Sequence, residues 1–91
     1  MPSTSFNEIW DRIVKYSGET FNTITGLEFT YEIKNNGFYP SRTKYIISKE
    51  DFKKTYQMIP VNGPGMISKE VRGPSYIWAV LYDPRISLRE W

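Results

Sequence analysis

The chain contains no cysteine and no histidine among its 91 residues. Without cysteine it cannot form disulfide bridges or thiolate zinc sites. Without histidine it lacks the commonest metal ligand and the usual general base near neutral pH. A Ser-His-Asp or Cys-His nucleophile system is therefore excluded. We expect a protein that is not an enzyme and that uses no cofactor and no metal.

Long apolar runs are also missing. No run in the sequence approaches the roughly 18 consecutive apolar residues of a membrane-spanning helix. Residues 1–5 lack the basic and apolar regions of a signal peptide. We therefore expect a cytoplasmic protein with no membrane partner. The formal charge of +2 is too small to indicate a nucleic-acid partner by itself.

The residues that are present fit a small globular protein. Hydrophobic residues make up 40% of the chain and charged residues 24%, which is ordinary for such a protein. The aromatic share of 16% is high. Because aromatic side chains bury much area each, a short chain can build a sufficient core from few of them. We expect residues 1–91 to form a single small domain.

The segment from residue 5 to residue 17 is predicted to be an amphipathic helix. Ser5 and Glu8 have the spacing of a capping box, in which each side chain reaches the other's backbone N–H. Gly18 suits the left-handed position that ends a helix. The apolar residues recur on one helical face; they are Phe6, Ile9, Trp10, Ile13 and Val14.

Two β-strands are predicted next, over residues 20–25 and 28–34, with a turn at Gly26 between them. The second segment alternates strictly, which is typical of a half-buried strand. Phe29, Tyr31 and Ile33 share one face of this strand. Charged and hydroxyl side chains share the other.

A returning strand follows the turn Asn35-Asn36-Gly37, whose residues tolerate positive φ. The strand begins at residues 38–39. It must be short, at an edge or bulged, because Pro40 cannot donate to a central ladder. Residues 45–47 can resume it. Together, the predicted strands form a three-stranded antiparallel meander that packs on the first helix.

The rest of the chain is predicted to be helical. Ser48 is placed to cap a helix that Pro60 stops, and residues 66–72 can form a short helix closed by Gly73. Residues 74–82 are apolar almost all round. Their β-branched and aromatic content favours a strand, whereas Pro74 and the length of the run favour the helix that we adopt.

The predicted fold class is therefore α+β. It comprises an N-terminal helix, a three-stranded antiparallel β-meander, and two or three short helices. Asp83-Pro84 is expected to end the last of these helices, and residues 86–91 form a tail that docks or frays. Trp10 and Trp78 lie within apolar patterns and are expected in the core. Trp91 has no pattern around it, so it is either exposed or packed on a partner.

The charge is uneven, because residues 41–63 contain five basic and two acidic residues. Hydroxyl and cationic side chains interleave here, as phosphate contacts require. Lys49 and Lys53 are one helical turn apart and share a face. Tyr39 and Tyr45 flank the segment and could stack on bases. The predicted binding residues for DNA or RNA are Ser41, Arg42, Thr43, Lys44, Lys49, Lys53 and Lys54.

Other interpretations of these features stay open. The basic segment is also consistent with a solvated edge that prevents aggregation, and such an edge is the more common origin of this pattern. A protein-interaction or inhibitor module, in the form of a homodimer for example, would use exposed aromatic residues such as Tyr39, Tyr45 or Trp91. Arg72 and Ser75 beside the start of the helix at Pro74 suit either an anion site or a plain helix boundary.

Overall fold

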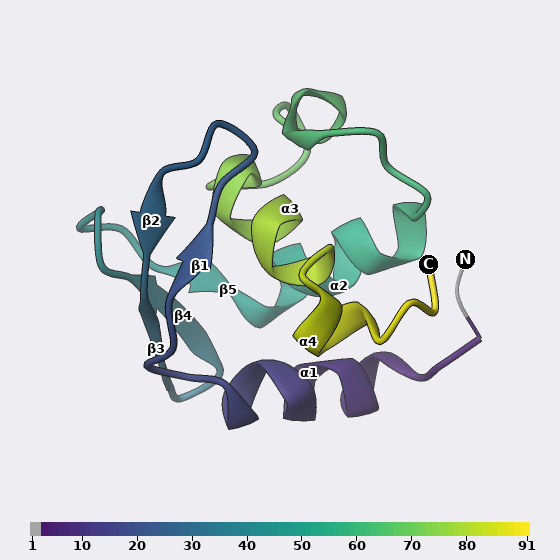
Figure 1. Cartoon of the computed structure of the whole chain (residues 1–91), viewed down its shortest axis with the longest axis horizontal. Coiled ribbons are helices and arrows are strands. Elements are labelled where there is room, and N and C mark those ends of the chain that lie inside the picture. Colours follow the sequence, from purple (N-terminus) through teal and green to yellow (C-terminus); the bar gives the residue numbers. More distant parts are fainter. Residues whose placement is uncertain (1–2) are drawn as a thin grey trace.

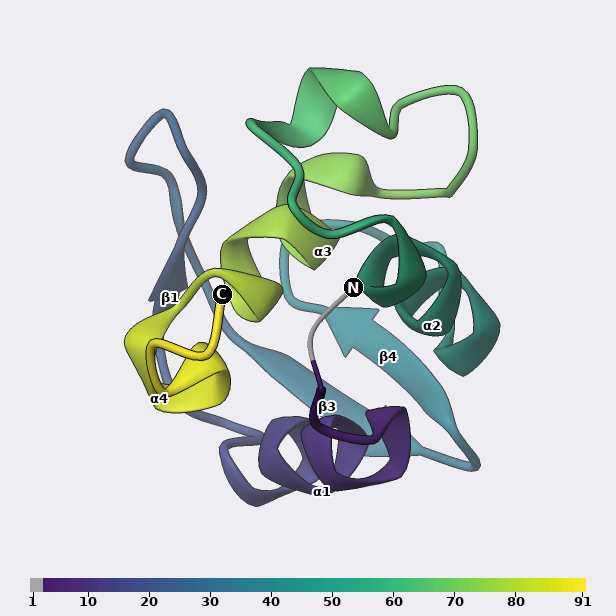
Figure 2. The same ribbon diagram turned by 90° about the vertical axis from the view of Figure 1, so that its right-hand side faces the viewer.

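The computed structural model describes residues 3–91 and has an α+β fold (Figure 1). The helices are α1 (Phe6–Lys15), α2 (Lys49–Met58), α3 (Pro74–Leu81), α4 (Pro84–Ser87) and the 3₁₀ helix η1 (Pro64–Met66). The strands are β1 (Phe21–Asn22), β2 (Glu28–Phe29), β3 (Tyr31–Lys34), β4 (Gly37–Pro40) and β5 (Ile47–Ser48). Figures 1 and 2 show the helices gathered on one side of the strands. This element order confirms the predicted fold class.

The predicted three-stranded antiparallel sheet is present, but its strands differ from those expected. It has the order β3-β4-β5, while β1 and β2 form a separate two-stranded sheet. Residues 28–34 are divided at Thr30, whose N–H and C=O both bond Ser41. Residues 45–47 do not resume β4. Instead Ile47 begins a strand of its own that returns antiparallel to β4.

The first predicted strand, residues 20–25, is shortened to Phe21–Asn22 by a turn. The Thr23 hydroxyl accepts a hydrogen bond from the Leu27 N–H at 3.1 Å. Gly26 lies between them with a φ of 89°, in the left-handed region. Residues 23–25, which the sequence pattern assigned to the strand, therefore belong to the turn.

The tight hairpin between β3 and β4 is confirmed. Asn35 and Asn36 have φ angles of 52° and 62°, and Lys34 pairs with Gly37 across them. Two successive left-handed residues give the twist that a two-residue hairpin needs. Pro40 is the last residue of β4, where its missing N–H interrupts no continuing ladder.

Tyr31 lies at the centre of an aromatic core. Its ring centroid is 4.5 Å from that of Phe38 in a stacked arrangement and 5.3 Å from that of Phe21. Its hydroxyl donates to the Ile13 carbonyl of α1 at 2.5 Å. Burial raises the pKa of Tyr31, so the hydroxyl keeps the proton that it donates. One buried side chain thus joins α1 to both β-sheets.

Two of the three helices predicted after residue 47 are present. The Ser48 hydroxyl accepts from the Asp51 N–H at 3.2 Å, which confirms the cap of α2. The helical alternative for residues 74–82 is also confirmed, since α3 covers Pro74–Leu81. The predicted helix over residues 66–72 is absent from the described structure; η1 is followed by turns. This segment buries only Ile67, too little apolar surface to stabilise a short helix.

Asp83-Pro84 ends α3 as predicted, but it also starts α4. The Asp83 carboxylate accepts from the Arg85 N–H at 2.9 Å and pairs with the Arg85 guanidinium at the same distance. Arg85 in turn lies 3.9 Å from the centroid of the Phe21 ring and donates to the Thr20 carbonyl at 2.8 Å. Arg85 thus holds the N-terminus of α4 against β1.

The tail docks on the rest of the chain. Trp91 donates from Nε1 to the Leu81 carbonyl at 2.9 Å, and its ring lies 5.3 Å from that of Tyr56. Arg12 bonds Glu90 at 3.0 Å and the Ile86 carbonyl at 2.9 Å. Trp91 is therefore half-buried inside this chain. None of the described helices combines the length and the apolar character needed to cross a bilayer.

Replacing Tyr31 with phenylalanine should lower the free energy of unfolding by about 1–2 kcal/mol, because a buried hydrogen bond is lost while the ring packing remains. Urea unfolding measures this change. Tyr39→Phe is the matched control, because the Tyr39 side chain is only half-buried. Equal unfolding midpoints for both variants would contradict the role of the Tyr31 hydroxyl.

Candidate functional site

The residues of the predicted phosphate-binding segment fall into two groups, one at each end of β4. Gly37 pairs with Ser48, so α2 starts beside the first residue of β4. Ser41 follows the last residue and bonds Thr30. Four residues of extended chain separate these ends, a distance of about 13 Å.

The first group is a loop that is hydrogen-bonded to β2 and to Thr30, the residue between β2 and β3. The Ser41 hydroxyl accepts from the Thr30 N–H at 3.0 Å. Arg42 donates from Nε to the Glu28 carbonyl, and the Thr43 hydroxyl donates to the Tyr45 carbonyl. These bonds use the hydroxyl groups that were predicted to meet phosphate. Arg42 and Lys44 remain exposed in this loop.

The second group consists of the three lysines of α2, two of which contact different parts of the chain. The Lys49 ammonium lies 5.7 Å from the centroid of the Trp10 ring of α1. Lys54 donates to the Glu70 carbonyl at 3.4 Å, and Lys53 is exposed. A shallow hollow on this helix is lined by both signs of charge; its residues are Glu50, Asp51, Lys53, Lys54 and Gln57. The carboxylates of this hollow would repel a phosphate group.

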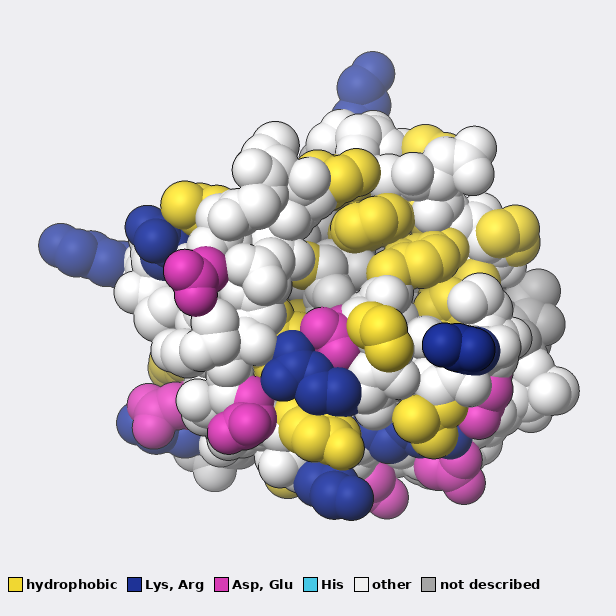
Figure 3. Space-filling view, viewed as in Figure 1, with side chains coloured by type: hydrophobic (Ala, Val, Ile, Leu, Met, Phe, Trp, Pro, Cys, Tyr) yellow, Lys and Arg dark blue, Asp and Glu magenta, His cyan; other side chains and the backbone are white. Residues whose placement is uncertain are grey.

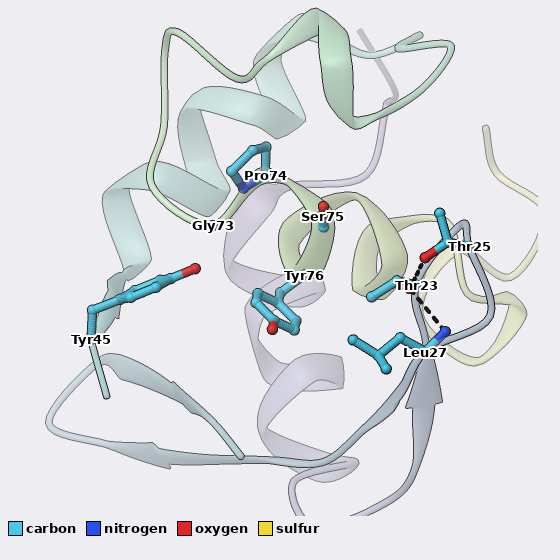
Figure 4. A pocket seen from close by; sticks show the side chains of 8 residues that line it. All are labelled: Thr23, Thr25, Leu27, Tyr45, Gly73, Pro74, Ser75 and Tyr76. Carbon is cyan, nitrogen blue, oxygen red and sulfur yellow. Dashed lines mark hydrogen bonds between the residues drawn. The ribbon is translucent and has the colours of Figure 1, made fainter. Parts of the chain in front are cut away.

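A second hollow, a cleft of about 180 Å³, lies between the β1–β2 hairpin and the start of α3 (Figure 4). The residues that line it are uncharged: Thr23, Thr25, Leu27, Tyr45, Gly73, Pro74, Ser75 and Tyr76. The Thr23 and Thr25 hydroxyls bond each other at 3.1 Å. Burial raises the pKa of Tyr45, whose hydroxyl therefore stays neutral.

This cleft bears on the anion site suggested for Arg72 and Ser75. Ser75 lines the cleft, but Arg72 is not among the residues that line it. The Arg72 guanidinium instead lies 5.5 Å from the centroid of the Tyr45 ring. The cleft thus presents hydroxyl groups and aromatic rings, and the arrangement suits a neutral group better than an anion.

A third feature is an apolar surface that spreads over α3 and the loop after α2. We call it the aromatic face and define it by the side chains that contribute to it: Ile24, Pro64, Met66, Trp78 and Tyr82. Figure 3 shows hydrophobic side chains gathered over this part of the molecule, while charged side chains lie mostly below it and at the left edge.

Trp78 and Tyr82 form the flat centre of the aromatic face. They are one turn apart, with Trp78 on α3 and Tyr82 directly after its last residue, and their rings stack with centroids 4.9 Å apart and an interplanar angle of 18°. The Trp78 Nε1–H donates to the Val61 carbonyl at 3.1 Å, and the Tyr82 hydroxyl accepts from the Val61 N–H at 2.7 Å. Both polar atoms are thus directed to the backbone of the loop, so the half-buried rings present apolar surface outward.

Two exposed aliphatic side chains from other segments contribute to the aromatic face. Met66 is 56% exposed, and its Sδ accepts from the Asn62 N–H at 3.2 Å. Ile24 is 55% exposed and comes from the tip of the β1–β2 hairpin, beside Gly63. Large apolar side chains that cluster in the open are unusual and mark interaction sites.

The sequence reasoning missed the aromatic face. Trp78 was expected in the core, but its ring is only half-buried. The i, i+4 spacing of Trp78 and Tyr82 was the available signal, although it marks a buried helix face equally well. Ile24 and Met66 come from segments far apart in the sequence, so no local pattern could have grouped them.

Comparison with models of protein families, with curated proteins and with solved structures finds no match for this chain. Among residues 3–91, no group of three or more Asp and Glu side chains is placed to hold a metal ion. The functional inference therefore depends on the geometry of the surfaces described above.

Proposed function

We propose that this chain is a non-enzymatic protein-interaction module whose aromatic face docks on the same face of a second copy. The observation that supports the proposal is that the Val61 backbone forms hydrogen bonds with the Trp78 indole nitrogen and the Tyr82 hydroxyl oxygen. A partner can cover the Trp78 ring without leaving its N–H unpaired, and the Tyr82 oxygen already accepts a hydrogen bond. Tyrosine, tryptophan and methionine are also the residues that concentrate binding energy in interfaces.

The charge distribution favours a second copy as the partner. A two-fold contact brings identical surfaces together, so any charge at its centre would face a like charge. The five side chains of the aromatic face carry no charge. The net charge of the whole chain, +2, adds only a weak repulsion between copies.

Sedimentation equilibrium over a range of protein concentrations tests this proposal. The wild-type chain should sediment as a monomer–dimer mixture that shifts toward the dimer as concentration rises. Met66→Glu should raise the dimer Kd by roughly thirtyfold, about 2 kcal/mol, because it places a charge inside the apolar contact. Met66 is exposed, so the variant is expected to fold.

Val14→Glu is the matched control. Val14 is 44% exposed on α1, at the opposite end of the molecule from η1 (Figure 1). This variant should dimerise like the wild type. A wild-type chain that stays monomeric at every concentration would contradict the proposal, and so would equal losses in the two variants.

Binding of DNA or RNA phosphates is a second candidate function. It is favoured by the loop after β4, where Arg42 and Lys44 are exposed while neighbouring polar groups are bonded to β2 and to Thr30. The anchoring of this loop holds the two cations near each other at little entropic cost. Ser41 and Thr43 then serve to shape the loop, and the lysines of α2 form a separate surface.

The salt dependence of binding to random duplex DNA tests this candidate. Affinity that depends on phosphate contacts should fall by orders of magnitude between about 50 and 200 mM salt. The double variant Arg42→Ala, Lys44→Ala should make the negative slope of log K against log salt less steep by about two. Lys53→Ala with Lys54→Ala is the control and should leave the slope unchanged. Absence of binding at low salt would remove this candidate.

A further inference from the structure

Two Asn-Gly pairs lie in different surroundings in this structure. Asn36-Gly37 belongs to the hairpin between β3 and β4, and Asn62-Gly63 belongs to the loop after α2. An asparagine followed by glycine can lose its side-chain amide, because glycine has no Cβ to hinder attack by its own backbone nitrogen. The structure decides which of the two pairs is free to react.

We propose that Asn62 is a site of spontaneous deamidation and that this modification disrupts the aromatic face with time. The Gly63 backbone nitrogen attacks Cγ of Asn62, forms a new C–N bond and loses its proton. The bond from Cγ to the side-chain nitrogen breaks, and ammonia leaves. Water then opens the resulting succinimide at either carbonyl and gives aspartate or isoaspartate. The reaction needs water alone and involves no oxidant or reductant.

The surroundings of Asn62 permit this attack. Its side chain is exposed, and Gly63 has an extended backbone with φ 176° and ψ 171°. Within the described residues, the Gly63 N–H donates no hydrogen bond. The nitrogen is therefore free to approach the side chain without breaking an interaction of the fold.

The surroundings of Asn36 oppose the same reaction. Gly37 is buried and pairs with Lys34 on one side and with Ser48 on the other. The hairpin must open before the Gly37 nitrogen can reach the Asn36 side chain, and opening of a paired sheet costs free energy. Asn36-Gly37 thus provides an internal comparison within the same molecule.

Deamidation would act directly on the loop that builds the aromatic face. The Asn62 N–H bonds Met66, and the neighbouring Val61 bonds both Trp78 and Tyr82. A new carboxylate at this position adds a charge beside the apolar surface, and isoaspartate also lengthens the backbone by one carbon. The expected loss of dimerisation rests on the proposed function; the modification itself does not.

The test is incubation of the folded full chain in mildly alkaline buffer, followed by trypsin digestion and mass spectrometry. Cleavage after Lys54 and Lys69 yields peptide 55–69, in which Asn62 is the only asparagine. Cleavage after Lys34 and Arg42 yields peptide 35–42, which contains Asn36. Peptide 55–69 should deamidate roughly tenfold faster or more, because Asn36 reacts only after its ladder opens. In a denaturing concentration of urea the two rates should converge.

Gly63→Ala is the matched variant and should slow deamidation of peptide 55–69 severalfold. The fold accepts it, because Gly63 is extended and a Cβ there would approach no closer than 3.9 Å to Ile24. Equal rates for the two peptides in the folded chain would overturn the proposal, as would an unchanged rate in Gly63→Ala. Since the readout is mass, failure of the dimer proposal leaves this result intact and separately interpretable.

Discussion

The hydrogen bond from Tyr31 to the Ile13 carbonyl joins α1 to β3 at the place where the two β-sheets separate. The same side chain packs on Phe21 of one sheet and on Phe38 of the other. A tyrosine serves here where a phenylalanine would not, because it buries a large ring and also satisfies a buried backbone acceptor. The positions of α1 and both sheets therefore depend on one residue.

Other aromatic side chains that carry a polar atom also form hydrogen bonds with the backbone, but the exposure of their rings differs. The Trp91 indole N–H and the Tyr56 hydroxyl bond backbone carbonyls, and their rings pack on each other within the chain. Trp78 and Tyr82 also bond the backbone, yet their rings stay half-buried. The aromatic face results from this difference, because the Trp78 nitrogen and the Tyr82 oxygen are bonded to the backbone while apolar ring surface is left uncovered.

Features that depend on a few neighbouring residues were predictable from the sequence. The cap at Ser48 and the turn at Asn35-Asn36 formed as predicted, since each requires only local side-chain or backbone geometry. The capping box at Ser5 formed only in part: the Ser5 hydroxyl accepts from the Glu8 N–H, but the Glu8 carboxylate bonds Arg12 instead of the Ser5 N–H. The division of residues 28–34 was not predictable, because it depends on Ser41, which bonds Thr30 from a distant part of the chain.

The candidate sites also depend on contacts between parts of the chain that are distant in sequence. Residues 41–54 looked like one basic surface because they are contiguous in sequence, but β4 places its two halves at opposite ends of a strand. The residues of the aromatic face are spread from Ile24 to Tyr82 and meet only after folding. Contiguity in sequence was therefore misleading for the first surface and uninformative for the second.

The central claim is that the aromatic face meets its own copy, and NMR spectra of one labelled sample at high and low concentration test it most directly. On dilution, the Trp78 indole N–H and the Met66 methyl signals should shift together along one binding curve. The Trp91 and Trp10 indole signals should stay in place, because both rings are packed inside the chain. Signals of Trp78 and Met66 that do not move, or shifts confined to the loop of Arg42 and Lys44, would contradict the account.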